Sequence, residues 1–132
     1  MQELLPKNLE LNLMVKNSWS KQDFEIFKRE FEKWQDKFGL LGYQVYFKHE
    51  PCHSDEYATI TTSQPAMAAT VILNAEVTID EKKRRPIRLI AKHEALHLLT
   101  HRLVNLAYCR FLDDSDIVEA SEELTRKLEK LL

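Results

Sequence analysis

One ten-residue segment, from Ile90 to Leu99, constrains this chain more than any other. It reads Ile-Ala-Lys-His-Glu-Ala-Leu-His-Leu-Leu and contains the pattern His-Glu-x-x-His. On a helix, residues four apart lie on one face, one turn apart, so His93 and His97 can present imidazole nitrogens to a single metal ion. Zn²⁺ accepts such nitrogens at about 2.0–2.1 Å in a tetrahedral site. The segment therefore predicts a helix that binds zinc.

The glutamate inside the motif has the position of a catalytic base. Glu94 follows His93 and lies on the flank of the metal-binding face. A bound zinc ion lowers the pKa of its water from about 16 to about 7, and a carboxylate at this flank can take the proton that the water gives up. Zinc peptidases use this arrangement, so the motif predicts Glu94 as a catalytic residue.

The residues around the motif are mostly apolar, which predicts that the helix lies inside the domain. An alternative is an ordinary core helix that carries two histidines and a glutamate. Burying such groups without partners costs free energy, and this cost favours the metal-binding interpretation. The uncharged flanking residues are Ile90, Ala91, Ala95, Leu96, Leu98 and Leu99.

Length and composition indicate one soluble globular domain over residues 1–132. Hydrophobic residues make up 44% of the chain and charged residues 30%, as in ordinary soluble domains. A net charge of −2 gives no strong field to attract nucleic acid or a membrane. No run reaches the roughly 18 apolar residues of a membrane-spanning helix, and the first 15 residues lack the regions of a signal peptide. Two cysteines without a Cys-x-x-Cys pair indicate reduced thiols, so we expect a cytoplasmic protein.

The first strongly patterned element is an amphipathic helix after an N-terminal extension, residues 1–18. Alternating apolar residues at 9, 11, 13 and 15 of the extension indicate a short strand or a tail docked on the core. Ser20 is the expected N-cap of the helix, with Asp23 completing a shortened capping box, and Gly39 is expected to end it. Five aromatic residues form its core-facing stripe: Phe24, Phe27, Phe31, Trp34 and Phe38.

Three strands are expected between this helix and the metal-binding helix. Alternation of apolar and polar residues predicts a strand over residues 43–50. Enrichment in threonine, isoleucine and valine predicts two more, over 57–62 and 69–73. A helix, then strands, then further helices predict an α+β fold in which a mainly antiparallel sheet of three to four strands packs against the helices.

The metal-binding helix is expected to run from about Pro86, a residue suited to the first helical position, to about Leu106. The basic segment before and around its start, residues 82–88, is interpreted as a solvated turn, with binding of an anionic partner as the alternative. A loop at 108–114 leads to a last helix capped by Asp114 or Ser115. The predicted buried stripe of that helix contains Ile117, Leu124, Leu128 and Leu131.

A zinc site on this motif needs a third protein ligand, which leaves the fourth position for water. His101 lies one turn beyond His97, but the three histidines in that row span about 12 Å along the helix axis, too far for one ion. We expect His101 to support the ligands or to face the substrate. The elongated pattern His-Glu-x-x-His-x-x-Gly-x-x-His is absent, because Thr100 and Leu103 stand at its last two fixed positions.

The remaining candidates for the third ligand are three glutamates of the last helix. Glu119 points most directly away from the apolar stripe, whereas Glu122 and Glu123 lie nearer its two borders. Periodicity alone does not choose between Glu122 and Glu123, and for at least two of the three glutamates an exposed position on the helix is expected.

The chain resembles the minigluzincins, small zinc metallopeptidases of phages and bacteria, most strongly over residues 93–97 and 118–128. Over residues 20–75 the similarity lies in the order of elements, and residues 1–18 fall outside it. The resemblance implies a zincin-like fold whose C-terminal helix supplies a glutamate ligand. In similar proteins this glutamate stands three residues before an apolar or β-branched residue, which maps to Glu122 before Thr125. Thr125 is less apolar than is usual there, and this departure leaves Glu119 and Glu123 as alternatives.

These features predict a zinc-dependent metallopeptidase that hydrolyses peptide bonds with a metal-activated water. His93, His97 and Glu122 would bind Zn²⁺, and Glu94 would be the general base. The predicted strand around Val71, just before the motif, resembles the edge strand along which zincins lay an extended peptide or protein substrate. Candidates for an oxyanion donor are Tyr57, Tyr108 and His101.

Two other functions remain open at this stage. One is a zinc-stabilised binding or regulatory module without turnover, of use to a phage-type protein. The other is a DNA-associated factor that uses the basic segment 82–88, which would show a steep dependence of DNA binding on salt. The net charge disfavours nucleic acid as a partner, and the sequence does not indicate an oligomeric state.

Overall fold

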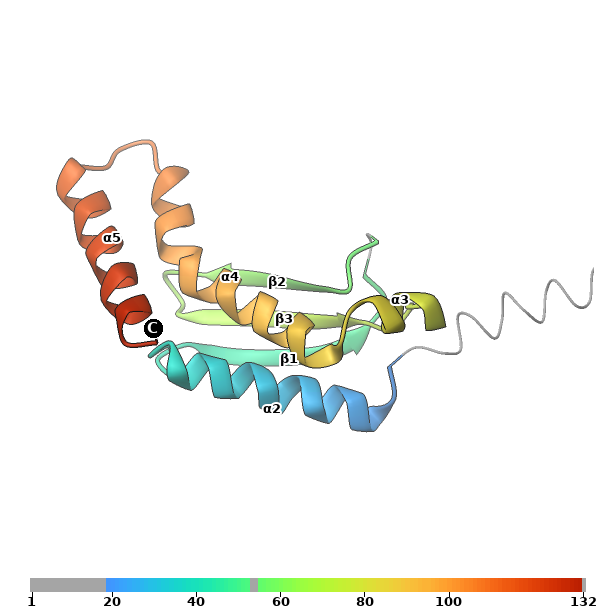
Figure 1. The fold of residues 1–132 in the computed structure, drawn as a ribbon. Helices are drawn as coiled ribbons and strands as arrows, with labels where there is room; N and C mark the ends of the chain where they lie inside the picture. The colour runs from blue at the N-terminus through green and yellow to red at the C-terminus, as the bar shows by residue number, and fades with distance from the viewer. Residues whose placement is uncertain (1–18, 53–54, 132) are drawn as a thin grey trace, which may run out of the picture.

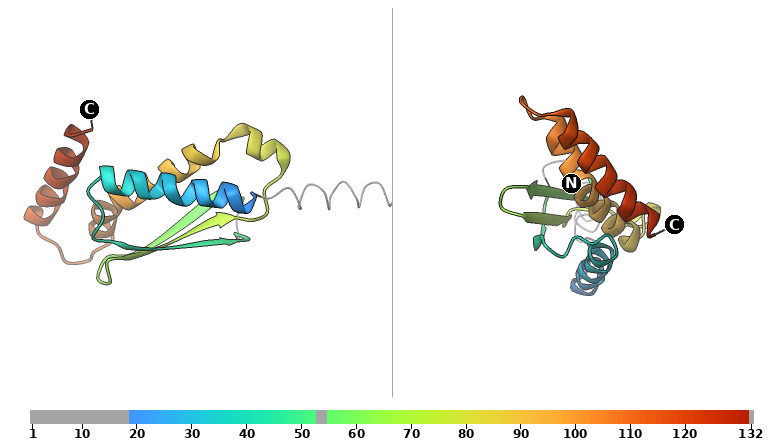
Figure 2. Two further views of the ribbon diagram at one scale, coloured as in Figure 1. Left: turned by 90° about the horizontal axis from the view of Figure 1, so that it is seen from below. Right: turned by 90° about the vertical axis from the view of Figure 1, so that its left-hand side faces the viewer.

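The computed structural model describes residues 19–52 and 55–131, so the predicted strand or tail at 9–15 lies outside the described residues. The fold is α+β, as predicted, and is built in two layers: α2 and α4 cover one face of a three-stranded sheet (Figures 1 and 2). The elements follow the order α2 (Lys21–Lys37), β1 (Gln44–Glu50), β2 (Ala58–Ser63), β3 (Ala68–Asn74), α3 (Ile79–Arg84), α4 (Ile87–Ala107) and α5 (Asp114–Glu129).

Helix α2 begins and ends at the predicted residues. The Ser20 hydroxyl accepts a hydrogen bond from the Asp23 backbone N–H at 3.1 Å, and the Asp23 carboxylate accepts one from the Ser20 backbone N–H at 3.1 Å. This reciprocal capping box satisfies two backbone donors that the first helical turn cannot. Gly39 follows the C-cap with φ of 71°, a conformation that glycine adopts without the steric cost of a Cβ.

The aromatic stripe of α2 forms the core between that helix and the sheet, as predicted. Phe27 and Phe31 are completely buried. Both rings meet Phe47 of β1 edge to face, with centroids 6.4 Å and 5.4 Å apart. Such pairs add roughly 0.5–1.5 kcal/mol to the free energy of unfolding beyond the burial of their area, so they fix α2 across β1.

The sheet has the strand order β1-β3-β2 and is mixed rather than mainly antiparallel. β1 and β3 are parallel, whereas β2 and β3 form an antiparallel hairpin. The predicted mainly antiparallel sheet is therefore wrong. The chain passes from β1 to the far edge of the sheet before β3 returns to fill the centre, and apolar alternation within each strand carries no information about that order.

A short helix, α3, replaces the turn that was expected in the basic segment. The Thr78 hydroxyl caps it by accepting a hydrogen bond from the Glu81 backbone N–H at 3.2 Å. Its first turn is acidic and its last turn basic, which complements the helix dipole. Pro86 is the N-cap of α4, so α4 starts one residue later than predicted.

Helix α4 is buried along its first part and leaves the sheet along its second. Its buried side chains are Glu94 and all the predicted apolar flanks of the motif except Leu96, which is 37% exposed. α5 packs beside the far end of α4 and forms a hairpin with it that extends past the sheet (Figure 1). α5 starts after the N-cap Asp113, one residue earlier than predicted, and of its predicted stripe Ile117 and Leu128 remain 42% and 38% exposed.

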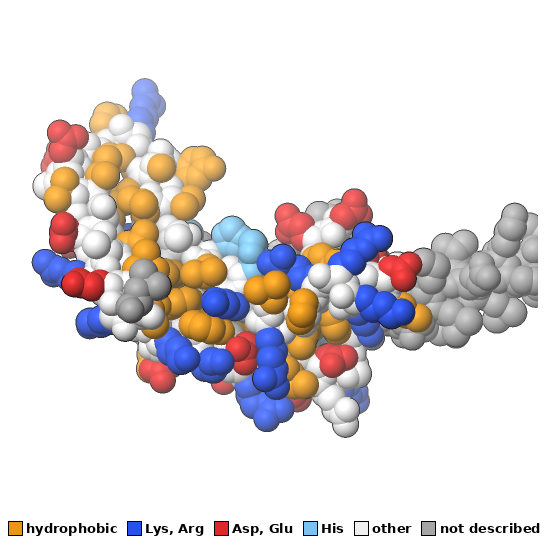
Figure 3. Space-filling model, viewed as in Figure 1, with side chains coloured by type: hydrophobic (Ala, Val, Ile, Leu, Met, Phe, Trp, Pro, Cys, Tyr) orange, Lys and Arg blue, Asp and Glu red, His pale blue; other side chains and the backbone are white. Residues whose placement is uncertain are grey.

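Hydrophobic side chains gather along this hairpin in Figure 3. The most exposed are Tyr108, at 86%, and Phe111, at 89%, near the loop between the helices. Among the residues that the structure describes, no helix is long and apolar enough to cross a membrane.

Candidate metal centre

His93 and His97 point toward each other from consecutive turns of α4. Their Nε2 atoms lie 3.1 Å apart, and the two rings meet at 82° with centroids 4.7 Å apart. The helix sets this distance, because residues four apart are stacked on one face. The two imidazoles converge as their spacing implies, and their binding of a metal ion stays a prediction.

The separation of these nitrogens fits a tetrahedral metal ion. Two bonds of about 2.0–2.1 Å at the tetrahedral angle place their nitrogens about 3.3 Å apart, close to the 3.1 Å observed. Burial lowers the pKa of His93, and positive charge at His97 and Arg85 lowers it further. A lowered pKa keeps the imidazole neutral, which is the form that binds a metal.

Glu94 is nearly buried beside this pair. The Glu94 residue is 5% exposed and lies on the flank of the histidine face. Burial, and then the negative charge of Glu56, raise the pKa of Glu94 to about 7, while Arg85 acts in the opposite direction. A carboxyl group with a pKa near neutrality is suited to take up and release a proton at physiological pH.

Arg85 is a part of the site that was not predicted. Its Nη2 lies 3.4 Å from Nδ1 of His93. Because a guanidinium can only donate, Nδ1 accepts this contact and the ring proton lies on Nε2. A metal ion at Nε2 requires the proton on Nδ1, so the Arg85 contact belongs to the metal-free protein and would break when a metal binds.

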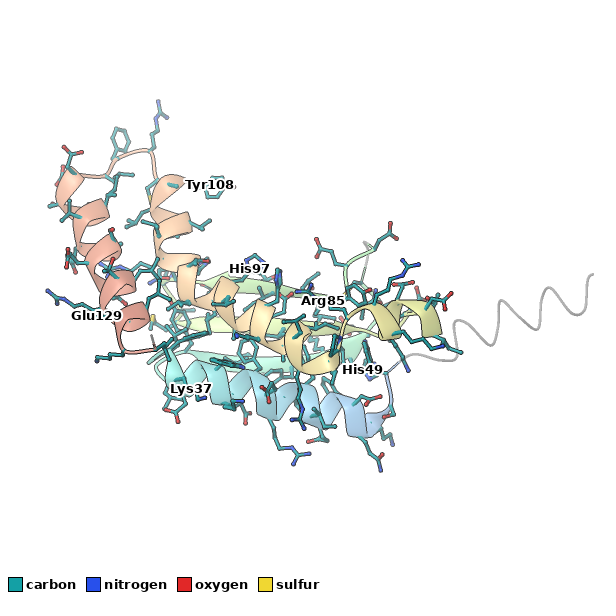
Figure 4. All side chains as sticks on the ribbon, viewed as in Figure 1. Lys37, His49, Arg85, His97, Tyr108 and Glu129 are labelled. Carbon is teal, nitrogen blue, oxygen red and sulfur yellow. The ribbon has the colours of Figure 1, made fainter. Side chains whose placement is uncertain are left out.

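The histidines and Glu94 open into a cleft of about 660 Å³ between α4 and β2. One wall is β2 with the two residues before it, and the other is the histidine face of α4 from Ile90 to Val104. Arg85 and Glu56 line it as well. In Figure 4, His97 and Arg85 lie on the side of α4 that faces β2, and Figure 3 shows histidine side chains at the surface there.

The strand beside this cleft is β2, not β3. β3 is the central strand of the sheet, and Val71 is completely buried in the core. The prediction that the Val71 strand forms the edge is therefore wrong, because β2 lies outside β3 in space although it precedes it in sequence. In the described structure β2 pairs with β3 alone, which leaves its outer backbone groups along the cleft.

Of the predicted substrate-facing and oxyanion candidates, His101 and Tyr57 line the cleft. Nε2 of His101 is buried without a hydrogen-bond partner, and burial lowers the pKa of this histidine. The Tyr57 hydroxyl donates to the backbone carbonyl of Glu81 at 3.0 Å, so it is engaged with α3. Tyr108 lies at the exposed end of α4, labelled in Figure 4, outside the residues that line the cleft.

The structure does not bring Glu122 to the histidines. Its side chain is 61% exposed, with Arg126 at 3.9 Å as its ionic neighbour. Glu119 and Glu123, the two alternatives, both bind Arg102 of α4. None of these glutamates lines the cleft. Within the described part of the chain, no cluster of three or more His, Cys, Asp or Glu side chains is arranged to hold a metal ion.

The basic segment does not form one continuous positive face. The Lys82 ammonium lies over the Trp19 ring, 5.2 Å from its centroid, whereas Arg85 turns into the cleft toward His93. Arg88 lies near Glu30 of α2, where its charge lowers the pKa of that carboxyl group together with Lys33, which has the larger effect. The DNA-binding alternative stays a prediction.

Nothing in the sequence pattern distinguishes Glu56 from other polar loop residues, and the cations beside Arg85 favour a solvated position for it. Arg85 ends a run of four cations, Lys82 to Arg85, for which a solvated turn is expected. Glu56 stood among polar turn residues, and its place beside the cleft follows from the strand order. No protein-family model, curated protein or solved structure matches this chain.

Proposed function

We propose that this protein is a zinc-dependent metallopeptidase, with a zincin-like arrangement of its helices and sheet. The observation that carries the proposal is the pair of Nε2 atoms 3.1 Å apart on α4, with the buried Glu94 beside them in an open cleft. An ordinary core helix would not direct two imidazoles and a carboxyl group into one cleft. The resemblance of residues 93–97 to the minigluzincins supports the same activity, although the α5 glutamate that it implies does not line the cleft.

His93 and His97 are the residues that would hold the ion. When bound there, zinc supplies a Lewis acid and makes water nucleophilic at neutral pH. Glu94 accepts the proton of the attacking water and donates it to the leaving amine. Its pKa of about 7 would suit a group that both takes up and releases a proton near neutral pH.

An extended peptide is the substrate that the cleft accommodates best. The outer edge of β2 offers backbone N–H and C=O groups to a further strand, and β-addition of this kind needs no particular substrate sequence. Such a strand would pass along the histidine face of α4, because β2 and that face are the two walls of the cleft. Arg85 at one end and His101 toward the other would contact side chains of the bound peptide.

The proposal is tested by metal content and by Glu94→Gln. The purified protein should contain about one equivalent of zinc by mass spectrometry. Against a library of fluorogenic peptides, wild type should show hydrolysis that chelation removes. Glu94→Gln keeps the ligands and the shape of the side chain, so it should retain zinc and lose about 10²–10⁴-fold in rate.

The same measurements separate the competing functions. Zinc present in wild type without turnover, and Glu94→Gln indistinguishable from it, would favour a zinc-stabilised binding or regulatory module. Full hydrolytic activity of Glu94→Gln would mean that another group is the base. Absence of zinc from the purified protein, with no uptake on titration, would refute the metallopeptidase.

A further inference from the structure

The histidine pair leaves a defined position for a third ligand. Both Nε2 atoms come from the face of α4 that lines the cleft, so a third ligand would have to approach from the cleft. The next group on the same face, His101, lies a further turn along the axis, about 6 Å beyond His97. A third protein ligand is therefore expected from the wall opposite α4, which is β2 and the residues before it.

Two carboxyl groups line this cleft, Glu56 and Glu94. Glu94 is on α4 itself, beside the histidines, where it serves as the base. Glu56 is on the opposite wall, directly before Tyr57 and the start of β2. Glu56, His93 and His97 line the same cleft, Glu56 from the wall opposite the two histidines. It is thus near the histidine pair and on the required side of it.

The backbone of Glu56 is fixed although its side chain is exposed. Its carbonyl accepts a hydrogen bond from Nδ2 of Asn74 at 2.8 Å, and the Asn74 backbone N–H donates to the Tyr57 carbonyl at 2.9 Å. Asn74 is 3% exposed, and its Oδ1 also accepts from the backbone of Cys52 at 3.2 Å. A buried side chain therefore holds the main chain beside the cleft, while the Glu56 side chain has solvent to move through.

The glutamates of α5 have partners that keep them elsewhere. Arg102 on α4 binds both Glu119 and Glu123, and Glu122 lies near Arg126. Bringing any of them to the histidines would require α5 to leave its packing against the far end of α4. A rotation of the Glu56 side chain about its own bonds is a much smaller change.

We propose that Glu56 is the third protein ligand of the zinc site, binding from the sheet side of the cleft. The inference rests on the proposed zinc site at His93 and His97. It makes the metal a link between α4 and the start of β2, so that zinc ties together the two walls between which the substrate passes. The cation also removes the repulsion between the Glu56 and Glu94 carboxylates that the metal-free protein carries.

The test is zinc affinity in the full chain, measured by competition with a chromophoric chelator. Glu56→Gln keeps the size of the side chain and removes the anionic ligand, so zinc affinity should fall by more than about 100-fold, beyond the loss typical of groups that only support a ligand. Glu122→Gln is the matched control and should bind zinc as wild type does. Circular dichroism of the metal-free variants should show an unchanged fold.

Cobalt provides a readout that does not depend on affinity. With Co²⁺ at saturation, the visible absorption of Glu56→Gln should differ from that of wild type, because one oxygen ligand is replaced, and the spectrum of Glu122→Gln should not.

If Glu56→Gln retains wild-type zinc affinity and cobalt spectrum, Glu56 is not a ligand. Loss of the metal from Glu122→Gln would also mean that Glu56 is not the third ligand. It would show instead that α5 moves to the site. If wild type binds no zinc while folded, the proposed function fails together with this inference. If wild type and Glu56→Gln both bind while His93→Ala does not, the inference alone fails.

Discussion

The two halves of α4 have the same helical geometry and opposite surroundings. Residues 87–99 pack beside α2 and against the sheet, and every buried residue of α4 lies in this half. Residues 100–107 run past the sheet and pair with α5, and Val104 there is 47% exposed. The histidine pair and Glu94 belong to the buried half, whereas Arg102, which binds the α5 glutamates, belongs to the exposed half.

This difference shows why the site forms where it does. In the first half, Glu94 is buried while His93 and His97 are exposed toward the cleft, and desolvation raises the pKa of Glu94 and lowers that of His93. In the exposed half, charged groups find partners at the surface, where an ion pair contributes about 0–1 kcal/mol. Glu94 is therefore held as part of an oriented site in the first half, whereas Arg102 in the second half forms surface ion pairs with glutamates of α5.

The largest expected difference between the halves is in zinc binding. Replacing His93 or His97 with alanine removes a nitrogen ligand, so zinc affinity should fall by more than about 100-fold. His101→Ala, one turn further along the same face, should change it much less. Chelator competition on the three variants checks this. Equal zinc content in all three and in wild type would contradict the assignment of the ligands.

Side-chain truncation should separate the halves in stability. Leu98 is 1% exposed, and Leu98→Ala should lower the free energy of unfolding by about 2–5 kcal/mol through lost burial and a cavity. Val104→Ala, on the half-exposed part of the helix, should cost less than about 1 kcal/mol. Urea unfolding curves measure both. Similar losses for the two variants would show that the hairpin with α5 is as tightly packed as the core.

Arg102→Ala tests how α5 is held. Arg102 binds Glu119 and Glu123, whose side chains are 71% and 42% exposed. Removing these surface pairs should lower the free energy of unfolding by at most about 1 kcal/mol, and less at high salt. Hydrogen exchange of α5 amides should become faster, while zinc affinity stays unchanged. A gain in zinc affinity would instead indicate that a freed α5 glutamate reaches the histidines.

The smallest expected effect is a pH dependence at His101, where the two halves meet. Burial lowers the pKa of His101 in the folded protein, so the folded state binds protons less readily than the unfolded state. Neutral His101 therefore contributes to the free energy of unfolding above the ordinary histidine pKa of about 6.5. This contribution is lost as the pH falls through the lowered pKa. In metal-free protein, His101→Gln should therefore lose less thermal stability than wild type between pH 7.5 and pH 5. An identical acid dependence would assign that loss to other groups.

Local features of this chain could be predicted because they depend on neighbours in sequence. The Ser20–Asp23 capping box, the aromatic stripe of α2 and the pairing of His93 with His97 all arise within one or two helical turns. The strand order could not be predicted, because β1 and β2 carry similar alternation and only their packing decides which of them borders β3 on each side. The errors about Val71 and about the antiparallel sheet share this cause.

The site was partly predictable for the same reason. His93, Glu94 and His97 are local to one helix, whereas Glu56 and Arg85 reach the cleft through tertiary structure. Glu122 was inferred from a resemblance that presumes where α5 packs. In the structure α5 contacts the exposed half of α4, and periodicity on α5 alone holds no information about that contact.

The strand order also bears on how the chain folds as it leaves the ribosome. β1 is made first, but its hydrogen-bonding partner is β3, with Gln44 opposite Ala68. At about 5–20 residues per second, roughly 1–5 s pass before that partner has been synthesised. The β2–β3 hairpin closes within microseconds once both strands have emerged. We therefore expect the β2–β3 hairpin to form as a unit and then to pair with β1. Until that happens, β1 is unpaired and accessible to chaperones.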